Sequence, residues 1–189
     1  MVKHNKPESA FYGGSFDPPH LGHRRIVQAV MHRLAPERIV IEPTWLNPFK
    51  TKGYAEPQQR LQWVRRIFAN YPCVDIDTYE IAQQRSVSTF ETIRHLLCRY
   101  DIRYIVIGSD NLPTLTQWHR FAWLNDRFTW VVATRRGFDA DTAALRRAVV
   151  LNVDVPVSST SIRAGEGLEY LDKKLRSEIV PYYHQNGIV

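Results

Sequence analysis

The sequence predicts an α/β fold, a doubly wound and mostly parallel sheet with helices on both faces. Two observations lead to this prediction. Short apolar runs alternate with amphipathic helical patterns along the chain, which is typical of parallel strands joined by crossover helices. One of these runs, at 105–107, contains only isoleucine and valine, as expected for a strand that is buried on both faces.

Six segments are expected to be strands or extended. The first, 10–12, runs into Gly13 and Gly14, and the second, 38–41, ends before Pro43. The others lie at 74–81, 105–107, 128–133 and 149–153. In a Rossmann-like sheet a ligand binds beyond the carboxyl ends of the strands, so the loops after residues 12, 41, 107 and 153 are where we expect the site.

Five segments are expected to be helical. The first follows Leu21 and carries an apolar stripe of Ile26, Val27, Val30, Met31 and Leu34. The second opens at Pro57, and the third spans 88–100 from the capping box Ser88-Thr89-Phe90-Glu91. Helices are also expected at 140–148 and from 159 onward, with a break at Pro181. The chain is expected to form one domain, 1–189, whose helical C-terminal segment starts near residue 159.

Composition narrows the class of protein. Hydrophobic residues make up 44% of 189, which indicates a globular fold, and the net charge of +6 fits partners that carry phosphate. The basic residues are spread along the chain, so no nucleic-acid partner is expected. Two distant cysteines exclude a disulfide framework, and no stretch is apolar enough for a signal peptide or a membrane helix. We therefore expect a soluble, cytoplasmic protein without a membrane partner.

The first loop combines glycines, a histidine pair and a helix start. It reads Gly13-Gly14-Ser15-Phe16-Asp17-Pro18-Pro19-His20-Leu21-Gly22-His23. The glycines allow the backbone to turn tightly beside a ligand, and the unpaired N–H groups of a helix start attract an anion. His20 and His23 are three residues apart and therefore share a helix face. Gly22 costs helix stability, which suggests that another group packs close to it.

Two other interpretations of the histidine pair remain open from the residues alone. The pair could bind zinc, but zinc requires three or four ligands and the other histidines are scattered. The histidines could also simply begin a helix without a chemical role. The surrounding glycines and prolines argue against a purely structural role for the histidines, because they specify a particular turn.

A second polar run lies near the end of the chain. Ser158-Ser159-Thr160-Ser161 precedes Ile162-Arg163 and a helical pattern. Any one hydroxyl there could be a simple N-cap. Several hydroxyl donors, a helix start and a guanidinium can together also hold a polyphosphate.

These two runs resemble the signatures of the HxGH nucleotidyltransferase α/β superfamily. The first loop is most similar to that of the bacterial nicotinate-nucleotide (nicotinic acid mononucleotide) adenylyltransferases. Two further stretches match in the family's order: Pro43 with Asn47-Pro48-Phe49-Lys50, and Gly108-Ser109-Asp110 followed by Trp118. The matching stretches span residues 11 to 163.

The resemblance implies a reaction and its site residues. The enzyme would transfer AMP from ATP to nicotinate mononucleotide, giving deamido-NAD and pyrophosphate in NAD biosynthesis. His20, His23 and Arg163 would be catalytic. The implied ATP site comprises Gly13, Gly14, Ser15, Phe16, His20, Gly22, His23, Gly108, Asp110, Ser159, Thr160, Ser161, Ile162 and Arg163. The implied acceptor site comprises Lys50, Thr89, Asp110, Trp118 and His119.

The chemistry needs no general base, because the attacking phosphate is already ionised at neutral pH. Positioning and neutralisation of charge then carry catalysis. Mg²⁺ is expected as a cofactor that is carried by the ATP phosphates. The sequence shows no dedicated metal site, and Asp17 could at most contact the metal indirectly. ATP and nicotinate mononucleotide are the expected partners, and a homo-oligomer is compatible with the sequence.

Three rival functions can be distinguished by experiment. Another superfamily enzyme, such as a pantetheine-phosphate adenylyltransferase, would use a different acceptor. A nucleic-acid-binding module of the class I tRNA synthetase kind would give a salt-dependent gel shift. A nucleotide sensor without catalysis is disfavoured by the presence of both histidines and the arginine.

Overall fold

The computed structural model describes residues 6–134, 140–153 and 155–185, and these residues contain a six-stranded sheet. The strand order in this sheet is β3-β2-β1-β4-β5-β6, and every pair of neighbouring strands is parallel. The strands are β1 (Glu8–Gly14), β2 (Arg38–Pro43), β3 (Val74–Ile76), β4 (Asp101–Gly108), β5 (Thr129–Thr134) and β6 (Ala148–Asn152). The predicted doubly wound α/β fold is confirmed, and the sheet is wholly parallel rather than mostly so.

The strand order locates the place where a ligand binds. The chain builds outward from β1 through β2 to β3, and then returns to the other side of β1 with β4. In such sheets the crevice lies where the order reverses, beyond the carboxyl ends of the two central strands. Here those ends are Gly14 of β1 and Gly108 of β4, and each leads directly into a run that the sequence had singled out.

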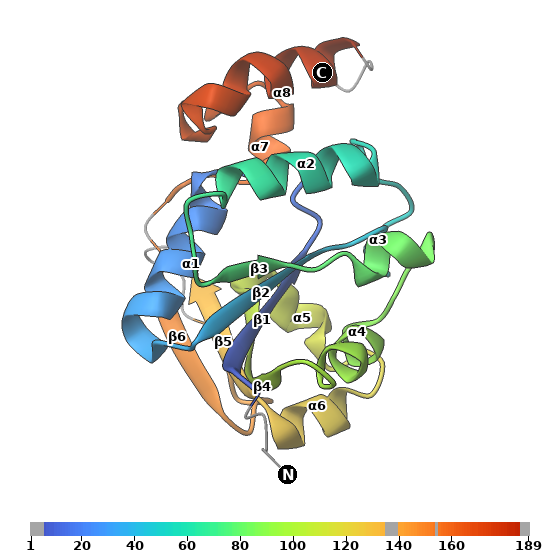
Figure 1. Cartoon of the computed structure of the whole chain (residues 1–189), viewed down its shortest axis with the longest axis vertical. Coiled ribbons are helices and arrows are strands. Elements are labelled where there is room, and N and C mark those ends of the chain that lie inside the picture. The colour runs from blue at the N-terminus through green and yellow to red at the C-terminus, as the bar shows by residue number, and fades with distance from the viewer. Residues whose placement is uncertain (1–5, 135–139, 154, 186–189) are drawn as a thin grey trace.

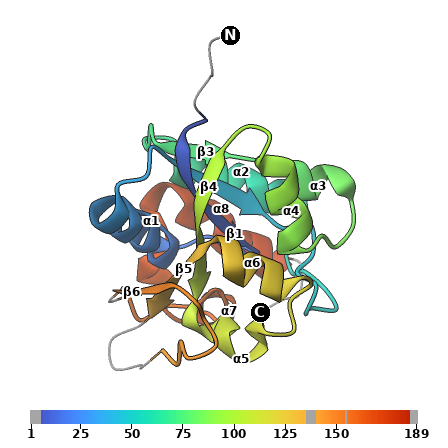
Figure 2. The same cartoon turned by 90° about the horizontal axis from the view of Figure 1, so that it is seen from below.

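Alternating strand residues divide the core into two layers. In β1, Ala10 and Tyr12 face one layer and Phe11 faces the other, as expected for the two-residue period of a strand. The first layer contains α1 (Leu21–Leu34), α2 (Pro57–Ile67), α7 (Ser159–Arg163) and α8 (Lys173–Gln185). The second contains α4 (Thr89–Leu96), α5 (Leu112–Leu115) and α6 (Phe121–Arg127). Figures 1 and 2 show α1 on one side of the sheet and α4 and α6 on the other.

The C-terminal segment docks on α2, as Figure 1 shows. Glu178 of α8 accepts hydrogen bonds from Trp63 Nε1 at 2.9 Å and from Gln59 at 3.1 Å. Leu175, Ile179 and Tyr183 are buried at intervals of four residues, which places them on one face of the helix. Pro181 lies inside α8 and does not break it, so that prediction was wrong. The helix continues because the carbonyl that Pro181 leaves unpaired belongs to Ser177, and Ser177 is exposed to water.

The predicted helix at 140–148 is also wrong. The described part, from residue 140, is irregular, and β6 already begins at Ala148. Local polar contacts oppose the helical propensity of this segment. Asp141 Oδ1 accepts from the N–H of Ala143, and Asn125 Oδ1 accepts from the N–H of Arg146.

Two other boundaries differ from the predicted ones. Only Val74–Ile76 of the extended segment 74–81 is a strand, because Asp77 Oδ1 accepts from the N–H of Tyr79 and starts α3 (Tyr79–Gln83). The helix expected over 88–100 ends at Leu96. Two short 3₁₀ helices, η1 (Ser109–Asn111) and η2 (Leu168–Tyr170), complete the described elements. None of the described helices is both long and apolar enough to span a membrane.

Candidate active site

The two histidines cap the helix that follows β1. His20 is the N-cap of α1, and its Nδ1 accepts from the N–H of Gly22 at 3.1 Å. His23 Nδ1 accepts in turn from the N–H of His20 at 3.1 Å. The two imidazole rings lie side by side, with their centroids 3.9 Å apart. This reciprocal arrangement is a capping box built from two imidazoles.

The capping contacts fix the position of the ring protons. A nitrogen that accepts a hydrogen bond carries no proton, so each neutral ring has its proton on Nε2. Burial lowers the pKa of His23 to about 3, against a smaller opposing effect from the backbone of His20. At neutral pH His23 is therefore an uncharged donor through Nε2, and it is not a general acid.

Two glycines make room for polar side chains of the site. A Cβ on Gly22 would lie 2.8 Å from the His20 ring and 3.4 Å from Val157. The close neighbour predicted for Gly22 is thus the imidazole of His20 itself. A Cβ on Gly108 would clash with Asp110 Oδ1, so glycine allows this carboxylate to fold back over the end of β4.

Some of the predicted ATP-site side chains lie in the core. Phe16 is only 2% exposed and packs against Tyr12 and His23, at ring centroid distances of 5.5 and 4.9 Å. Its backbone has a φ of 49°, a conformation that is costly for a residue with a side chain. Ile162 is 3% exposed. At both positions only the backbone can face a ligand, whereas Phe16 shapes the surroundings of His23.

Asp17 organises the loop instead of presenting a free carboxylate. Its side chain is buried and accepts from the N–H groups of Tyr54 at 2.8 Å and Ala55 at 3.0 Å. It also accepts from the hydroxyl of Tyr183 at 2.6 Å. Asp17 therefore joins the first loop to the 53–56 segment and to α8.

Arg60 was missed by the sequence analysis. Its guanidinium is buried and donates to the carbonyl oxygens of Ser15, Trp45 and Ala55, at 2.6, 2.9 and 3.0 Å. The three carbonyls belong to the loops that flank the crevice. A signal was available, because position 60 lies four residues before Val64 and therefore on the apolar stripe of α2.

The hydroxyl run at the start of α7 is engaged in local contacts. Ser158 and Ser161 form a capping box, with Ser158 Oγ accepting from the N–H of Ser161 at 3.0 Å. Ser159 Oγ donates to the carbonyl of Pro18 at 2.9 Å, which joins α7 to the first loop. The two signature runs, 141 residues apart in sequence, are thus in direct contact.

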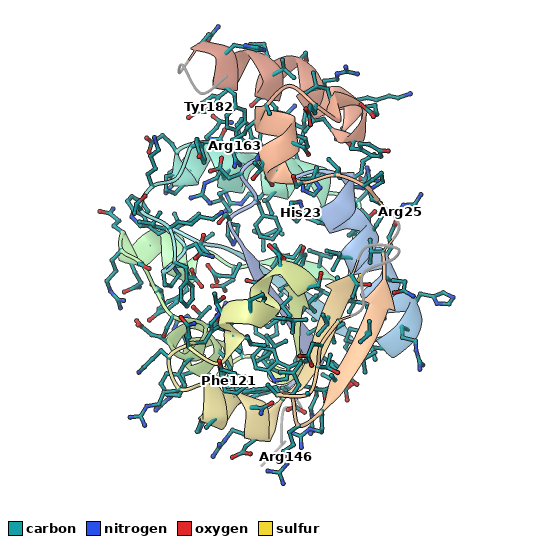
Figure 3. The ribbon with its side chains drawn as sticks, turned by 180° about the vertical axis from the view of Figure 1, so that it is seen from behind. His23, Arg25, Phe121, Arg146, Arg163 and Tyr182 are labelled. Carbon is teal, nitrogen blue, oxygen red and sulfur yellow. The ribbon has the colours of Figure 1, made fainter. Side chains whose placement is uncertain are left out.

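Arg163 and Lys50 both contact the first loop. The guanidinium of Arg163 donates to the carbonyl of Asp17 and to Thr160 Oγ1, and lies 4.1 Å above the ring of Tyr54. Lys50 Nζ lies 3.5 Å from Ser15 Oγ. Partial burial, and then the charge of Arg163, lower the pKa of Lys50. In Figure 3, Arg163 and His23 lie in the same region, near α7 and the start of α1.

Of the predicted acceptor residues, Thr89 and His119 lie at the start of α4, whereas Lys50 lies beside Ser15 and Asp110 follows β4. Ser88 Oγ lies 3.4 Å from His119 Nδ1, and the Phe90 ring packs edge-on against that imidazole. Thr89 begins the helix directly after Ser88. The indole of Trp118 is half-buried, and among the described residues nothing accepts from its buried Nε1.

Only half of the predicted capping box forms. Ser88 Oγ accepts from the N–H of Glu91, but the Glu91 carboxylate does not return to the N–H of Ser88, because it pairs with Arg85 and Tyr79.

The described residues offer little to a resident metal ion. They contain no group of three or more His, Cys, Asp or Glu side chains that could hold one. Asp17 has three donors already, and Asp110 is an exposed carboxylate at the end of β4. This set of residues fits a metal whose ligands come mainly from phosphate oxygens.

The chain matches known proteins of one family. Residues 11–165 match the cytidylyltransferase-like family. A probable nicotinate-nucleotide adenylyltransferase of Sulfurovum sp. (strain NBC37-1) is 45% identical over 179 residues, covering 95% of each chain. One of Sulfurimonas denitrificans (strain ATCC 33889 / DSM 1251) is 41% identical over 93% of this chain and 94% of its own.

A solved structure shares the fold. The nicotinic acid mononucleotide adenylyltransferase of Plasmodium falciparum, complexed with NaAD, superimposes with a TM-score of 0.74. The match covers 96% of this chain and 98% of the other, at 17% sequence identity. At that identity the likeness concerns the fold alone.

Proposed function

The chain belongs to the cytidylyltransferase-like family and, within it, to the nicotinate-nucleotide adenylyltransferases, and we propose that His20, His23 and Arg163 are its catalytic residues. The reaction transfers AMP from ATP to nicotinate mononucleotide, giving deamido-NAD and pyrophosphate. A phosphate oxygen of the mononucleotide bonds to the α-phosphorus of ATP, and the bond from that phosphorus to the oxygen bridging to the β-phosphorus breaks.

The observation that carries this assignment is the imidazole capping box. Because both Nδ1 atoms accept backbone N–H groups, each neutral ring carries its proton on Nε2, and we assign these Nε2–H groups as donors to the phosphate oxygens. Such preorganised donors stabilise charge as it develops on the α-phosphate, without reorganisation during the reaction. The N–H groups at the start of α1 add a positive potential at the same place.

Arg163 and Lys50 are assigned to the phosphates that leave. The planar guanidinium can contact two oxygens of the departing pyrophosphate while it remains stacked on Tyr54. Lys50, which follows β2 in the chain, supplies a single positive charge beside Ser15. Mg²⁺, bound by the phosphates, would supply further neutralisation of charge, and Asp110 is the exposed carboxylate available to a water on such an ion.

The acceptor is assigned to the start of α4. Thr89 and His119 offer donors there, and Trp118, which precedes His119 in the chain, has an indole N–H without a partner among the described residues. A set of donors suits the acid group of nicotinate, which only accepts hydrogen bonds.

Substitution of Arg163 tests the assignment of the leaving group. Arg163→Lys should lower kcat/KM for ATP by roughly 10-fold to 10²-fold. Lysine keeps the charge but loses the planar group that donates two hydrogen bonds at once, and it loses the stacking on Tyr54. The KM for the acceptor should change little. Arg25→Lys is the matched control, since Arg25 is exposed on α1 and lies at the margin of the molecule in Figure 3. Wild-type kinetics in Arg163→Lys would show that only a point charge is required.

A panel of acceptors tests the proposed function as a whole. The purified chain is incubated with ATP and either nicotinate mononucleotide or phosphopantetheine, and release of pyrophosphate is measured. We expect release with nicotinate mononucleotide and none above background with phosphopantetheine. The opposite result would assign the chain to another branch of the family.

A further inference from the structure

Three carboxyl groups are buried between the end of β2 and α3. Glu42, Asp77 and Glu80 are 0%, 8% and 3% exposed, respectively. Glu42 Oε1 accepts from the N–H of Glu80 at 3.0 Å, and the Glu42 and Asp77 side chains share a hydrogen bond that requires a proton, whereas among the described residues Glu80 Oε2 has no partner. Buried carboxylates without partners are costly, so at least one of these groups must hold a proton.

The charges around the cluster determine which group is ionised. Burial and the charge of Glu80 raise the pKa of Glu42 to about 9. Burial raises the pKa of Glu80 to about 7. Burial also opposes ionisation of Asp77, but the Arg99 guanidinium and the N–H of Tyr79 outweigh it and bring its pKa below the usual value. Asp77 therefore holds the negative charge, and the two glutamic acids hold protons at mildly acidic pH.

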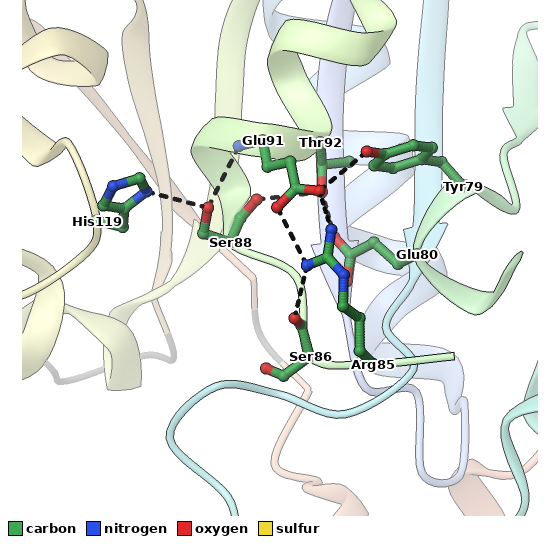
Figure 4. Close-up of polar contacts among 8 residues, drawn as sticks. All are labelled: Tyr79, Glu80, Arg85, Ser86, Ser88, Glu91, Thr92 and His119. Atoms are coloured by element: carbon green, nitrogen blue, oxygen red, sulfur yellow. Dashed lines mark hydrogen bonds and ion pairs between the residues drawn. The ribbon is translucent and has the colours of Figure 1, made fainter. Parts of the chain in front are cut away.

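A single hydroxyl connects Glu80 to the start of α4. Thr92 Oγ1 lies 2.7 Å from Glu80 Oε1 and 3.3 Å from the carbonyl oxygen of Ser88 (Figure 4). The hydroxyl has only one proton to donate. When Glu80 is protonated, it can donate to Thr92, and Thr92 can donate to Ser88. When Glu80 is ionised, Thr92 must donate to Glu80, and the carbonyl of Ser88 loses that contact.

Ser88 contacts the proposed acceptor residues, so a change in its hydrogen bonds affects their positions. It is the N-cap of α4, its Oγ accepts from the N–H of Glu91 at 3.3 Å, and it contacts His119. Thr89 follows it directly. The protonation of Glu80 thus acts on the two segments that were assigned above to the acid group of the acceptor (Figure 4).

We propose that Glu80 is a positioning residue for the acceptor, which in its protonated form holds Ser88 and Thr89 in place through Thr92. Ionisation of Glu80 reverses the Thr92 hydrogen bond and weakens binding of nicotinate mononucleotide. This inference rests on the proposed function, because it takes the start of α4 as the acceptor site.

The groups facing Glu80 from the neighbouring elements are mostly acidic. They are Glu42 from β2, Asp77 from the segment before α3 and Glu91 from α4, with Arg60 of α2 as the opposing cation. The charge of Glu91 is offset by Arg85. A negative charge on Glu80 is opposed by Glu91 more than it is stabilised by Arg60, whose guanidinium donates to three carbonyl oxygens, and it adds repulsion towards an acidic ligand.

The test compares KM for the acceptor, KM for ATP and kcat between about pH 6.5 and about pH 8.5, on either side of the Glu80 titration. In the wild type, KM for the acceptor should rise by roughly threefold to tenfold over this range, the scale of one lost hydrogen bond. Glu80→Gln stays neutral and can still donate to Thr92, so its KM should change with pH only through the titration of the substrate. Dividing the wild-type values by those of Glu80→Gln removes the titration of the substrate phosphates, whose second pKa is about 6.

Two substitutions at Thr92 isolate the hydroxyl. Thr92→Val keeps the shape and should raise KM for the acceptor at both ends of the pH range, by a similar factor. Thr92→Ser keeps the hydroxyl and should restore wild-type behaviour. KM for ATP and kcat should change by less than about twofold throughout, since neither group is assigned to ATP or to the transition state. A wild-type KM that follows that of Glu80→Gln at every pH would overturn the proposal.

Hydrogen exchange of the substrate-free protein separates a failure of this inference from a failure of the proposed function. The amides of Glu91 and Thr92, which bond to Ser88, should exchange faster in the wild type than in Glu80→Gln at the alkaline end, and equally at the acidic end. If exchange responds and KM for the acceptor does not, the contact is real but the acceptor binds elsewhere, and the proposed function of α4 is wrong. If exchange does not respond either, the positioning role of Glu80 is excluded.

Discussion

His20→Asn and His23→Asn are each expected to lower kcat by roughly 10²-fold to 10³-fold, the scale for loss of one preorganised donor to a developing oxyanion. Asparagine is a good N-cap residue, and its Oδ1 can take the place of the imidazole Nδ1 that accepts a backbone N–H. What it lacks is a donor at the position of Nε2. The substitution therefore removes the proposed chemistry while it keeps the helix start.

His32→Asn provides the control for this pair, because His32 is exposed in the last turn of the same helix. Thermal unfolding of all three variants should stay close to that of the wild type. If both active-site variants kept a near wild-type kcat, the two imidazoles would have a capping role only.

Nicotinate mononucleotide is expected to be preferred over nicotinamide mononucleotide by roughly 10-fold to 10²-fold in kcat/KM, and by more once the charge of the acid group is included. A carboxamide would turn an NH₂ group towards the donors at Thr89, Trp118 and His119 and leave at least one of them unpaired. Thr89→Val should reduce the preference, whereas Thr89→Ser should keep it. The measurement is kcat/KM for both acceptors at saturating ATP, and parity or a preference for the amide would refute the assignment.

The sequence predicted the structure correctly where a local residue pattern has a direct structural cause. Alternating apolar runs predicted the parallel sheet, and glycines after the first and fourth strands pointed to the ends of β1 and β4. The contact between Ser88 and His119 joins two segments that only the resemblance had associated. For His20, His23 and Arg163, the structure adds the geometry on which their proposed roles depend.

The features that sequence reasoning missed depend on long-range contacts. Arg60 reads as one polar residue among several in α2, and its importance arises from three carbonyls at Ser15, Trp45 and Ala55. The buried acids Glu42 and Glu80 are 38 residues apart and meet only once β2 and α3 are side by side. The segment 140–148 has helical propensity, but its contacts with Asn125 override that preference.

The most direct test of the account is a rapid-quench experiment in which ATP labelled at the α-phosphorus reacts with nicotinate mononucleotide on an excess of enzyme. The account predicts that the label passes straight into deamido-NAD and never becomes attached to the protein, since His20 and His23 only donate hydrogen bonds to the phosphates. It also predicts that His20→Asn and His23→Asn slow this single turnover by roughly 10²-fold or more with little change in ATP affinity. Label found on the protein, or a wild-type single-turnover rate in both variants, would contradict it.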